Sequence, residues 1–381
     1  MNTVYSDFAA TLAEIRVALT DLAIDQNKAD RGVMMRAAAA IAMFEGDTLR
    51  KAAGPILPGE LQGWSLPFPS LPFPSLPFPP LLIMTFSVLN SRATLPADMA
   101  ALCSKFDLSH RTLLSTNPKT EKSAVQTYIL HLSPADTSGV NVCPGAGNCK
   151  AICLHFAGNP VYMNGKAKAR VRRTLAYAAD PQRFMRLVIM AILGKLAKSS
   201  EPLAFRLNGT SDVVWEDIDF EITAEFATFC RIKFGAILPL GRRNIFEVFN
   251  FMRDNTGENV TFYDYTKVKH NWAECKRLGY HLTFSFDGYD NRANFKLAAN
   301  ALSAGVNIAA AFNIKKRKPL PGKAYLGNRS LSVVDGDLTD YRPSDPNGYK
   351  IIGLRFKLPH GIKWTPAQRD AFCLSADRMG V

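Results

Sequence analysis

Short apolar runs alternate with longer segments of helical spacing along most of the chain. The apolar runs predict strands at residues 128–132, 203–207, 236–240, 260–263, 281–286, 306–312, 332–334 and 351–356. The segments between them predict helices at residues 165–179, 181–198, 217–234, 243–254, 272–278, 291–304 and 366–379. Strands that alternate with helices in this way form βα units with mostly parallel pairing. The number of units predicts an α/β fold, built as a partial or complete TIM-like barrel.

The first 83 residues follow a different pattern. Residues 1–55 place apolar side chains at helical spacing, which predicts an N-terminal helical hairpin. Residues 56–83 are rich in proline, and the segment Ser-Leu-Pro-Phe-Pro occurs there three times in tandem. Proline at alternate positions excludes a helix and removes hydrogen-bond donors, so we expect an extended linker. The α/β domain then covers residues 84–381.

The balance of charge favours a polyanionic partner. The 381-residue chain carries 46 Lys and Arg against 33 Asp and Glu, a formal net charge of +13. Such an excess promotes encounter with DNA or another polyanion, although it does not bear on the fold. No apolar helix reaches the roughly 20 residues that a bilayer requires, so no membrane partner is expected. Seven cysteines and no secretory signal at the start favour a reducing cytoplasm.

Three of the cysteines lie close together, as Cys143, Cys149 and Cys153 in the pattern C-x5-C-x3-C. The proline and glycines between them permit tight turns, so that three thiolates can face one point. Three cysteines without a fourth in the loop are typical of a 4Fe-4S cluster that leaves one iron open. Zinc is the alternative, with a fourth ligand from His155, Cys103, Cys230 or Cys275. Unligated thiols are a third interpretation.

A strongly basic segment follows this cysteine loop. It places Lys166, Lys168, Arg170, Arg172 and Arg173 on a predicted helix. Side chains of this kind neutralise nucleic-acid phosphates, and the alternative is a solvated helix face. No aromatic platform for single strands accompanies the segment.

Polar residues also follow the strand predicted at 203–207, as Asn208, Gly209, Thr210, Ser211 and Asp212. Because the carboxyl ends of parallel strands meet at one edge, we expect these residues to lie near the cysteine loop. Residues 208–211 are then candidates for binding a cofactor, and Asp212 is a candidate for catalysis. A turn that caps the next helix uses the same residue types and is the alternative.

Two more strand ends carry candidate chemistry. Tyr265 and Lys267 follow the strand at 260–263, where a tyrosine near a lysine can serve acid–base chemistry or attack a phosphodiester. Asp335, Asp337 and Asp340 follow the strand at 332–334 and are candidates for a divalent cation, with turn and cap roles as the alternative.

At these motifs the chain resembles the gene product 88 domain family, which occurs in bacteriophages and bacterial genomes. The resemblance is carried by Leu114-Ser-Thr-Asn-Pro-Lys-Thr, His131-Leu-Ser-Pro-Ala-Asp-Thr-Ser-Gly-Val-Asn-Val-Cys-Pro, Arg206-Leu-Asn-Gly-Thr-Ser-Asp, Tyr263-Asp-Tyr-Thr-Lys, Tyr280-His-Leu-Thr-Phe-Ser, Val334-Asp-Gly-Asp and Ile352-Gly-Leu-Arg. It implies a phage-related setting in the cytoplasm of a bacterial host, and not a particular reaction. The segment before Met84 lies outside it.

The chain is similar in a weaker way to radical S-adenosylmethionine enzymes. Those enzymes carry three cluster cysteines on the loop after the first strand of a partial α/β barrel, and their open iron binds the cosubstrate. Here the spacing is C-x5-C-x3-C instead of C-x3-C-x2-C, and Asn208-Gly209-Thr210 stands where those enzymes have Gly-Gly-Glu. The likeness implies S-adenosylmethionine as a cosubstrate beside a 4Fe-4S cluster.

Two hypotheses follow from these patterns. The first is a phage-related iron–sulfur enzyme, similar to radical S-adenosylmethionine enzymes, that acts on or near nucleic acid. The second is a zinc protein of phage replication that binds DNA without redox chemistry. The sequence carries no indication of an oligomeric state.

Overall fold

The computed structural model describes residues 95–117, 120, 125–150, 153, 164–257, 259–358 and 363–375. The helical hairpin predicted for residues 1–55 and the linker predicted for residues 56–83 lie outside the described residues, as does His155.

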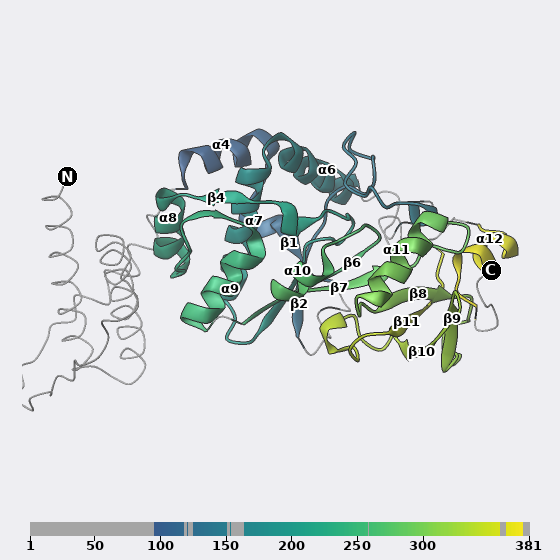
Figure 1. Ribbon diagram of the computed structural model, residues 1–381. Coiled ribbons are helices and arrows are strands. Elements are labelled where there is room, and N and C mark those ends of the chain that lie inside the picture. The colour runs from purple at the N-terminus through teal and green to yellow at the C-terminus, as the bar shows by residue number, and fades with distance from the viewer. Residues whose placement is uncertain are drawn as a thin grey trace, which may run out of the picture. The chain divides into compact units, whose positions relative to one another are not determined.

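Nine strands form one large and mostly parallel sheet (Figure 1). Their bounds are β1 Leu114–Ser115, β2 Gln126–Leu130, β3 Leu203–Arg206, β6 Val260–Thr266, β7 Tyr280–Ser285, β8 Ile308–Phe312, β9 Lys323–Leu326, β10 Arg329–Asp335 and β11 Lys350–Arg355. The spatial order is β1-β2-β3-β6-β7-β8-β11-β10-β9. Neighbours from β2 to β10 pair in parallel, whereas the outer strands β1 and β9 pair antiparallel. The short strands β4 (Phe220–Ile222) and β5 (Gly241–Arg243) form a separate antiparallel pair.

The strands from β2 to β8 follow one another across the sheet in chain order. This order results when successive βα units wind in one direction. The prediction of an α/β fold with mostly parallel pairing is therefore confirmed. Among the strands that the structure describes, β1 and β9 each pair with a single neighbour, so a closed TIM-like barrel is not seen.

Helices fill the connections between the strands. Their bounds are α4 Ala97–Phe106, α5 His110–Leu113, α6 Asn164–Ala179, α7 Pro181–Leu196, α8 Ala224–Phe234, α9 Ile245–Thr256, α10 Trp272–Arg277, α11 Arg292–Ser303 and α12 Pro366–Phe372. Short 3-10 turns lie at η1 Asn148–Lys150, η2 Trp215–Asp217 and η3 Arg342–Ser344. None of the described helices combines the length and the apolarity needed to cross a bilayer.

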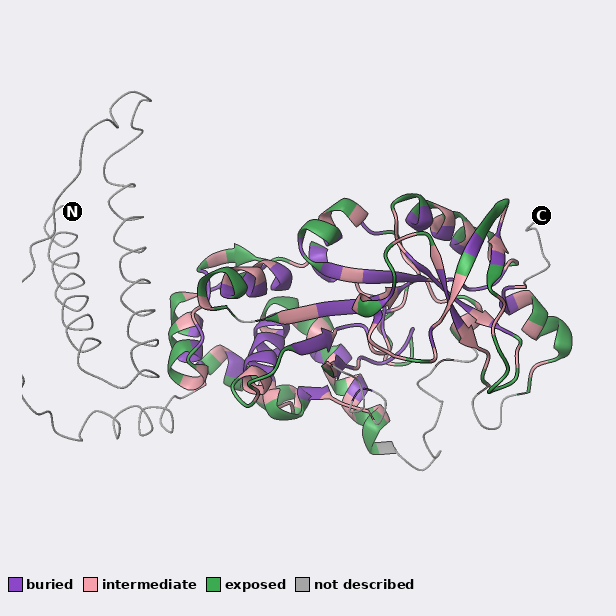
Figure 2. Ribbon diagram, turned by 90° about the horizontal axis from the view of Figure 1, so that it is seen from below, coloured by how far each residue is buried: buried purple, intermediate pink, exposed green. Residues whose placement is uncertain are grey.

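Helix α7 is the most deeply buried helix of the described residues. The Asp180 side chain caps its N-terminus by accepting the Arg183 N–H at 2.9 Å, and Pro181 supplies the fixed φ that suits the first helical position. Residues 184–193 are all buried, because α7 packs against α4, α5 and α6 on one side and the small strand β4 on the other. Figure 2 shows this concentration of buried residues in the strands and inner helices.

Two sequence predictions are wrong in their element type. Residues 236–240 were predicted as a strand, but they form an irregular segment that leads into β5. Residues 217–234 were predicted as one helix, but only Ala224–Phe234 is helical. The first part contains β4, in which Phe220 and Ile222 are buried on one face while Glu221 is exposed, an alternation of period two that suits a strand.

The two faces of the sheet differ in chemistry. On the helix side, Phe262 of β6 meets Phe246 of α9 edge-on with ring centroids 5.2 Å apart. Side chains alternate along a strand, so Tyr263 and Tyr265 of β6 lie on the other face. There Tyr341, next to η3, meets Tyr263 edge-on at 5.5 Å. Aromatic side chains therefore also line this second face, where Tyr263 is fully buried.

Candidate functional site

The carboxyl ends of β2, β3, β6 and β7 bring four loops together, and buried aspartates tie these loops to one another. Asp287, after β7, is fully buried and accepts the backbone N–H groups of Asn148 at 2.8 Å and Cys149 at 3.1 Å. Asn291 donates to the same carboxylate at 3.0 Å, and Lys267 Nζ lies 3.5 Å from it. The cysteine loop is thus fixed on the end of β7.

Asp212 makes a second tie. Its N–H donates to the carbonyl oxygen of Val142 at 2.8 Å, and its Oδ2 accepts the N–H of Lys267 at 2.8 Å. The residue therefore links the cysteine loop to the loops after β3 and β6. Burial raises the pKa of Asp212, although the N–H of Lys267 opposes that shift. Its Oδ1 is buried and has no hydrogen-bond partner among the described residues.

Asp264 of β6 makes a third tie, to the loop after β3. Its carboxylate accepts the N–H groups of Leu207 at 2.9 Å and Asn208 at 3.0 Å, and the hydroxyl of Tyr280 at 2.9 Å. Burial raises the pKa of Asp264 to about 6, even though Arg206 and these donors favour the charged form. Desolvation therefore outweighs three hydrogen bonds at this position.

Two glycines permit the close packing of these loops. A Cβ on Gly147 of the cysteine loop would lie 2.3 Å from Oδ2 of Asp287. A Cβ on Gly209 would lie 2.3 Å from Cγ2 of Ile129. Both distances are far below van der Waals contact, so these positions require glycine.

The three loop cysteines are half-buried free thiols. Cys143 donates a hydrogen bond from Sγ to the carbonyl oxygen of Thr210 at 3.5 Å. Burial, with a further contribution from Cys153 and Cys149, raises the pKa of Cys143 to about 12. Burial also raises the pKa of Cys149 to about 11, while the charge of Lys267 opposes the shift. The thiols therefore stay protonated at neutral pH unless a cation replaces the protons.

A different set of residues forms the tightest group of potential metal ligands in the part of the chain that the structure describes. Glu216, His270 and Cys275 are all buried, and their ligand atoms lie within 4.8 Å of one another. Glu216 Oε1 lies 2.5 Å from His270 Nδ1 and accepts a hydrogen bond from Cys275 Sγ at 3.1 Å. Glu216 Oε1 thus accepts from both partners, whereas Glu216 Oε2 is buried without a hydrogen-bond partner among the described residues. Cys275, which the sequence suggested as a fourth zinc ligand, is thus engaged in this group.

Lys267 and Tyr265 lie in different surroundings. Lys267 Nζ donates to Ser285 Oγ at 2.7 Å, and its side chain is only 12% exposed. This ammonium group faces the cysteine loop, as its effect on the pKa of Cys149 shows. The Tyr265 ring lies under the guanidinium of Arg206 at 5.2 Å, and burial raises the pKa of its phenol.

The residues expected to bind a cofactor make internal contacts. Asn208 Oδ1 accepts hydrogen bonds from Ser211 Oγ, Val213 N and Trp215 Nε1. Thr210 Oγ1 donates to the carbonyl oxygen of Leu132 at 2.6 Å. These polar side chains shape the loop after β3, and the prediction that residues 208–211 contact a cofactor remains a prediction.

The basic residues of α6 divide into two sets. Lys166, Lys168 and Arg172 are exposed. Arg170 is buried, and Arg173 donates hydrogen bonds to two main-chain carbonyl oxygens at 2.7 and 3.4 Å. The first set faces solvent, where Arg172 pairs with Asp107, whereas the second set packs α6 onto the domain.

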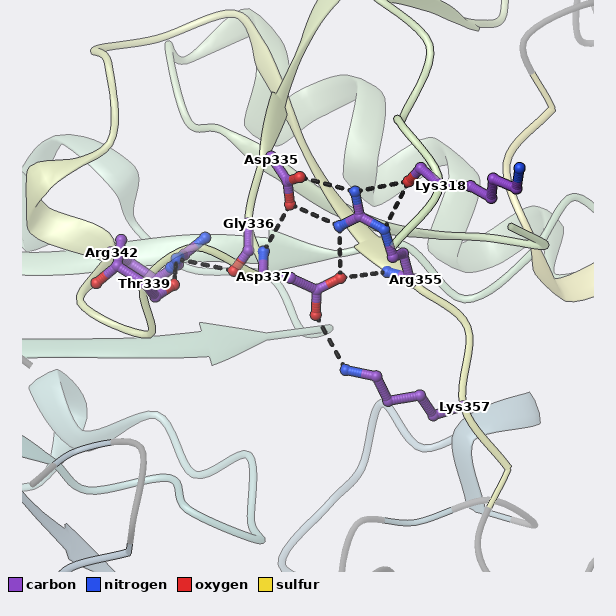
Figure 3. A network of polar contacts seen from close by, with 8 residues as sticks. All are labelled: Lys318, Asp335, Gly336, Asp337, Thr339, Arg342, Arg355 and Lys357. Carbon is purple, nitrogen blue, oxygen red and sulfur yellow. Dashed lines mark hydrogen bonds and ion pairs between the residues drawn. The ribbon is translucent and has the colours of Figure 1, made fainter. Parts of the chain in front are cut away.

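Two of the three aspartates considered for a divalent cation, Asp335 and Asp337, are paired with basic side chains (Figure 3). Arg355 donates from Nη1 and Nη2 to the two oxygens of Asp335, each at 2.8 Å. Asp337 Oδ2 accepts Arg355 Nη1 at 3.0 Å, and its Oδ1 accepts Lys357 Nζ at 3.0 Å. Both carboxylates are therefore neutralised by this Arg355 network rather than being available to a metal ion.

The fold and the site define an α/β protein with a three-cysteine loop held at the carboxyl edge of a parallel sheet. The chain belongs to the gene product 88 family, a phage family whose model matches residues 106–376. This match confirms the resemblance found in the sequence motifs. Neither a curated protein nor a solved structure matches the chain, so the comparisons lend no support to the likeness with radical S-adenosylmethionine enzymes.

Proposed function

We propose that this protein is an iron–sulfur enzyme of a phage that acts on or near nucleic acid in the host cytoplasm, and in which Cys143, Cys149 and Cys153 hold a 4Fe-4S cluster. The observation that carries the proposal is the anchoring of the cysteine loop at the carboxyl edge of the sheet. The Asp287 carboxylate holds two of its N–H groups. Carboxyl edges of parallel sheets are where α/β proteins assemble their active sites.

The chemistry of the loop cysteines fits a 4Fe-4S cluster. Burial raises the pKa values of Cys143 and Cys149, and the neighbouring loop thiols add to both shifts, so a strongly positive centre would replace the protons and relieve this repulsion. Three cysteines without a fourth in the loop would leave one iron of a 4Fe-4S cluster open, whereas a structural zinc ion would need a fourth ligand from outside the loop.

A bound cluster would supply one-electron transfer, and an open iron would accept a small cosubstrate such as S-adenosylmethionine. Three side chains would then control charge and proton transfer around the cluster. Lys267, held by Ser285 at 2.7 Å, keeps a positive charge beside Cys149 and favours the thiolate. Tyr265 would act as a hydrogen-bond donor, because a phenol is protonated at neutral pH and burial raises its pKa further. Asp212, with one buried unpartnered oxygen, is the candidate acceptor.

The experiment is anaerobic preparation of the full chain with absorption and electron paramagnetic resonance spectra. The wild-type protein should show cluster absorption, and Cys149→Ala should lose it. Cys103→Ser is a matched control, because Cys103 is a half-buried thiol outside the loop. Cluster spectra that survive Cys149→Ala and Cys153→Ala together would contradict the proposal.

A second candidate is a zinc protein that binds DNA through α6. The observation in its favour is the exposure of Lys166, Lys168 and Arg172 on one helix next to the cysteine loop. This second candidate predicts about one zinc ion per chain and an affinity for DNA that falls as the salt concentration rises. The triple variant Lys166→Ala, Lys168→Ala and Arg172→Ala should then weaken DNA binding, and unchanged affinity would argue against this candidate.

A further inference from the structure

A basic turn follows β8, far in sequence from α6. Lys315, Lys316, Arg317 and Lys318 are four consecutive exposed basic residues. The N–H of Lys318 donates to the carbonyl oxygen of Lys315 at 3.1 Å, which closes the turn. Four positive charges within one turn, with no acidic residue among them, form a local electrostatic site for a polyanion.

The backbone of this turn is strained at Arg317, whose φ is +72°. Glycine adopts such a φ at little cost, whereas other residues are disfavoured there. The sequence therefore has an arginine at position 317, although the backbone conformation there favours glycine. Strain of this kind is typical of positions that serve a ligand.

The Arg355 network holds the turn in place (Figure 3). Arg355 donates from Nε and Nη2 to the carbonyl oxygen of Lys318, at 3.0 and 2.9 Å. The same guanidinium is fixed by Asp335. In Figure 3 the Lys318 side chain extends away from this network, so its ammonium group is not used within it. The basic turn is thus organised before any ligand binds.

An aromatic group lies beside the turn. Phe356 stacks on Trp364 with centroids 5.6 Å apart, and Phe372 of α12 meets Trp364 edge-on at 5.5 Å. Asn313, two residues before the turn, donates to Asp370 of α12 at 3.2 Å. Figure 1 shows α12 at the end of the molecule where β8 and β9 lie. The turn and the aromatic group are therefore parts of one surface.

A cavity of about 430 Å³ opens between this aromatic group and the cysteine loop. Its lining residues are Gly147, Asn148 and Lys150 of the cysteine loop together with Asp290, Trp364, Gln368 and Ala371. The volume falls within the range of small-ligand pockets and is sufficient for a nucleobase. Trp364 stacks on Phe356 with one face of its ring, which leaves the other face for a base. Asn148 Nδ2 already donates to Asp287 O and Asp290 Oδ1, and Gln368 Oε1 already accepts from Thr365 N. The remaining groups are the Asn148 oxygen as an acceptor and the Gln368 amide nitrogen as a donor.

We propose that this surface binds single-stranded nucleic acid, with phosphates on the basic turn at residues 315–318 and one unstacked base in the cavity beside Trp364. Basic side chains that follow the backbone, next to an aromatic ring that stacks a base, are the combination that single strands require. The surface is distinct from α6. The proposal rests on the nucleic-acid part of the proposed function, because the cavity places the bound base beside the cysteine loop.

The test is fluorescence anisotropy of labelled single-stranded DNA and RNA oligonucleotides with the full chain across a range of salt concentrations. The triple variant Lys315→Ala, Lys316→Ala and Arg317→Ala should weaken binding. It should also reduce the steepness of the plot of log affinity against log salt concentration by about 2, because each of the three lost phosphate contacts contributes roughly 0.7. The matched control replaces three exposed lysines elsewhere with alanine, at Lys269, Lys276 and Lys296. It should change the affinity and its salt dependence less than the basic-turn variant does.

Trp364→Ala should weaken binding about tenfold and leave the salt slope unchanged, because it removes stacking and not charge. Trp364→Phe should recover most of that loss. Arg317→Gly should raise the melting temperature by relieving the positive φ while it weakens binding, which a purely structural residue would not do. Iron content reports separately on the cluster, and none of these variants should change it.

Equal losses in the basic-turn variant and the lysine control would overturn the proposal. So would wild-type affinity in Trp364→Ala. Binding lost only in the Lys166, Lys168 and Arg172 variant would assign the nucleic acid to α6 instead. A preference for DNA over RNA, or the reverse, identifies the natural strand and supports the proposal in either case.

Discussion

The cysteine loop and the Glu216–His270–Cys275 group contain similar ligand types but differ in how their donors are satisfied. In the buried group, the carboxylate accepts from both partners, at 2.5 and 3.1 Å. In the cysteine loop, backbone groups are held firmly by Asp287, while the thiols raise one another's pKa. In the buried group the ligand atoms bond to one another. In the loop the backbone is fixed by Asp287 instead, and it is there that we propose the cluster.

The largest expected effect tests how the loop is held. Asp287→Ala should lower the free energy of unfolding by about 3 kcal/mol, because it leaves two backbone N–H groups and the Lys267 ammonium without their buried acceptor. Denaturant unfolding of the cluster-free protein measures this. Asp254→Ala, at an exposed position, is the control and should stay within about 0.5 kcal/mol. A loss below about 1 kcal/mol at Asp287 would show that the loop is not anchored there.

The second effect concerns the thiols themselves. With a pKa of about 11, Cys149 of the cluster-free protein should react with an alkylating reagent at pH 8 about a hundredfold more slowly than an ordinary thiol. The rate should rise about tenfold for each pH unit up to that pKa. Mass spectrometry of the modified peptide follows the reaction. A Cys149 that reacts as fast as free cysteine would contradict the raised pKa.

The third effect tests the close packing of the loop. Gly147→Ala should destabilise the protein by about 2 kcal/mol, because its Cβ would lie 2.3 Å from Asp287 Oδ2. Gly165→Ala is the matched control, since nothing lies within 4 Å of a Cβ at that position in α6. Alanine favours a helix, so the control should be neutral or stabilising. Equal unfolding free energies for the two variants would argue against the packing.

The smallest effect concerns the buried group. Burial alone would raise the pKa of Glu216, but the hydrogen bond and charge of His270 outweigh it and lower that pKa. A lowered pKa means that the ionised carboxylate stabilises the fold above about pH 4.5 and loses this contribution as the pH falls through the folded pKa. Glu216→Gln should cost about 1 kcal/mol at pH 7 and less at pH 3. A cost independent of pH would contradict this assignment.

Much of the fold was predictable from local pattern. The apolar run at Leu203–Arg206 and the helix at Pro181–Leu196 were found close to their observed bounds, because strong periodicity marks both. The segment at 236–240 was misassigned because apolar residues are buried there without a strand partner. The spacing of apolar residues predicts which side chains are buried, but it does not predict whether the segment pairs with a strand.

The candidate site was predictable only in part. The convergence of strand ends correctly predicted that residues 208–212 lie near the cysteine loop, where the Asp212 N–H donates to Val142, since parallel strands share one edge. The burial of Arg170 was not predictable, because the consecutive basic residues of α6 are distributed over all faces of the helix. Glu216 and His270 are 54 residues apart, so no local pattern joins them. The basic turn at residues 315–318 was visible in the sequence, but its aromatic neighbour was not.

The most direct test of the account is the metal and sulfide content of wild-type protein prepared without oxygen. The account predicts about four iron and four sulfide per chain, as a 4Fe-4S cluster requires. It also predicts that Cys143→Ala, Cys149→Ala or Cys153→Ala each abolishes this content. A colourless protein that holds about one zinc per chain after anaerobic reconstitution would contradict it.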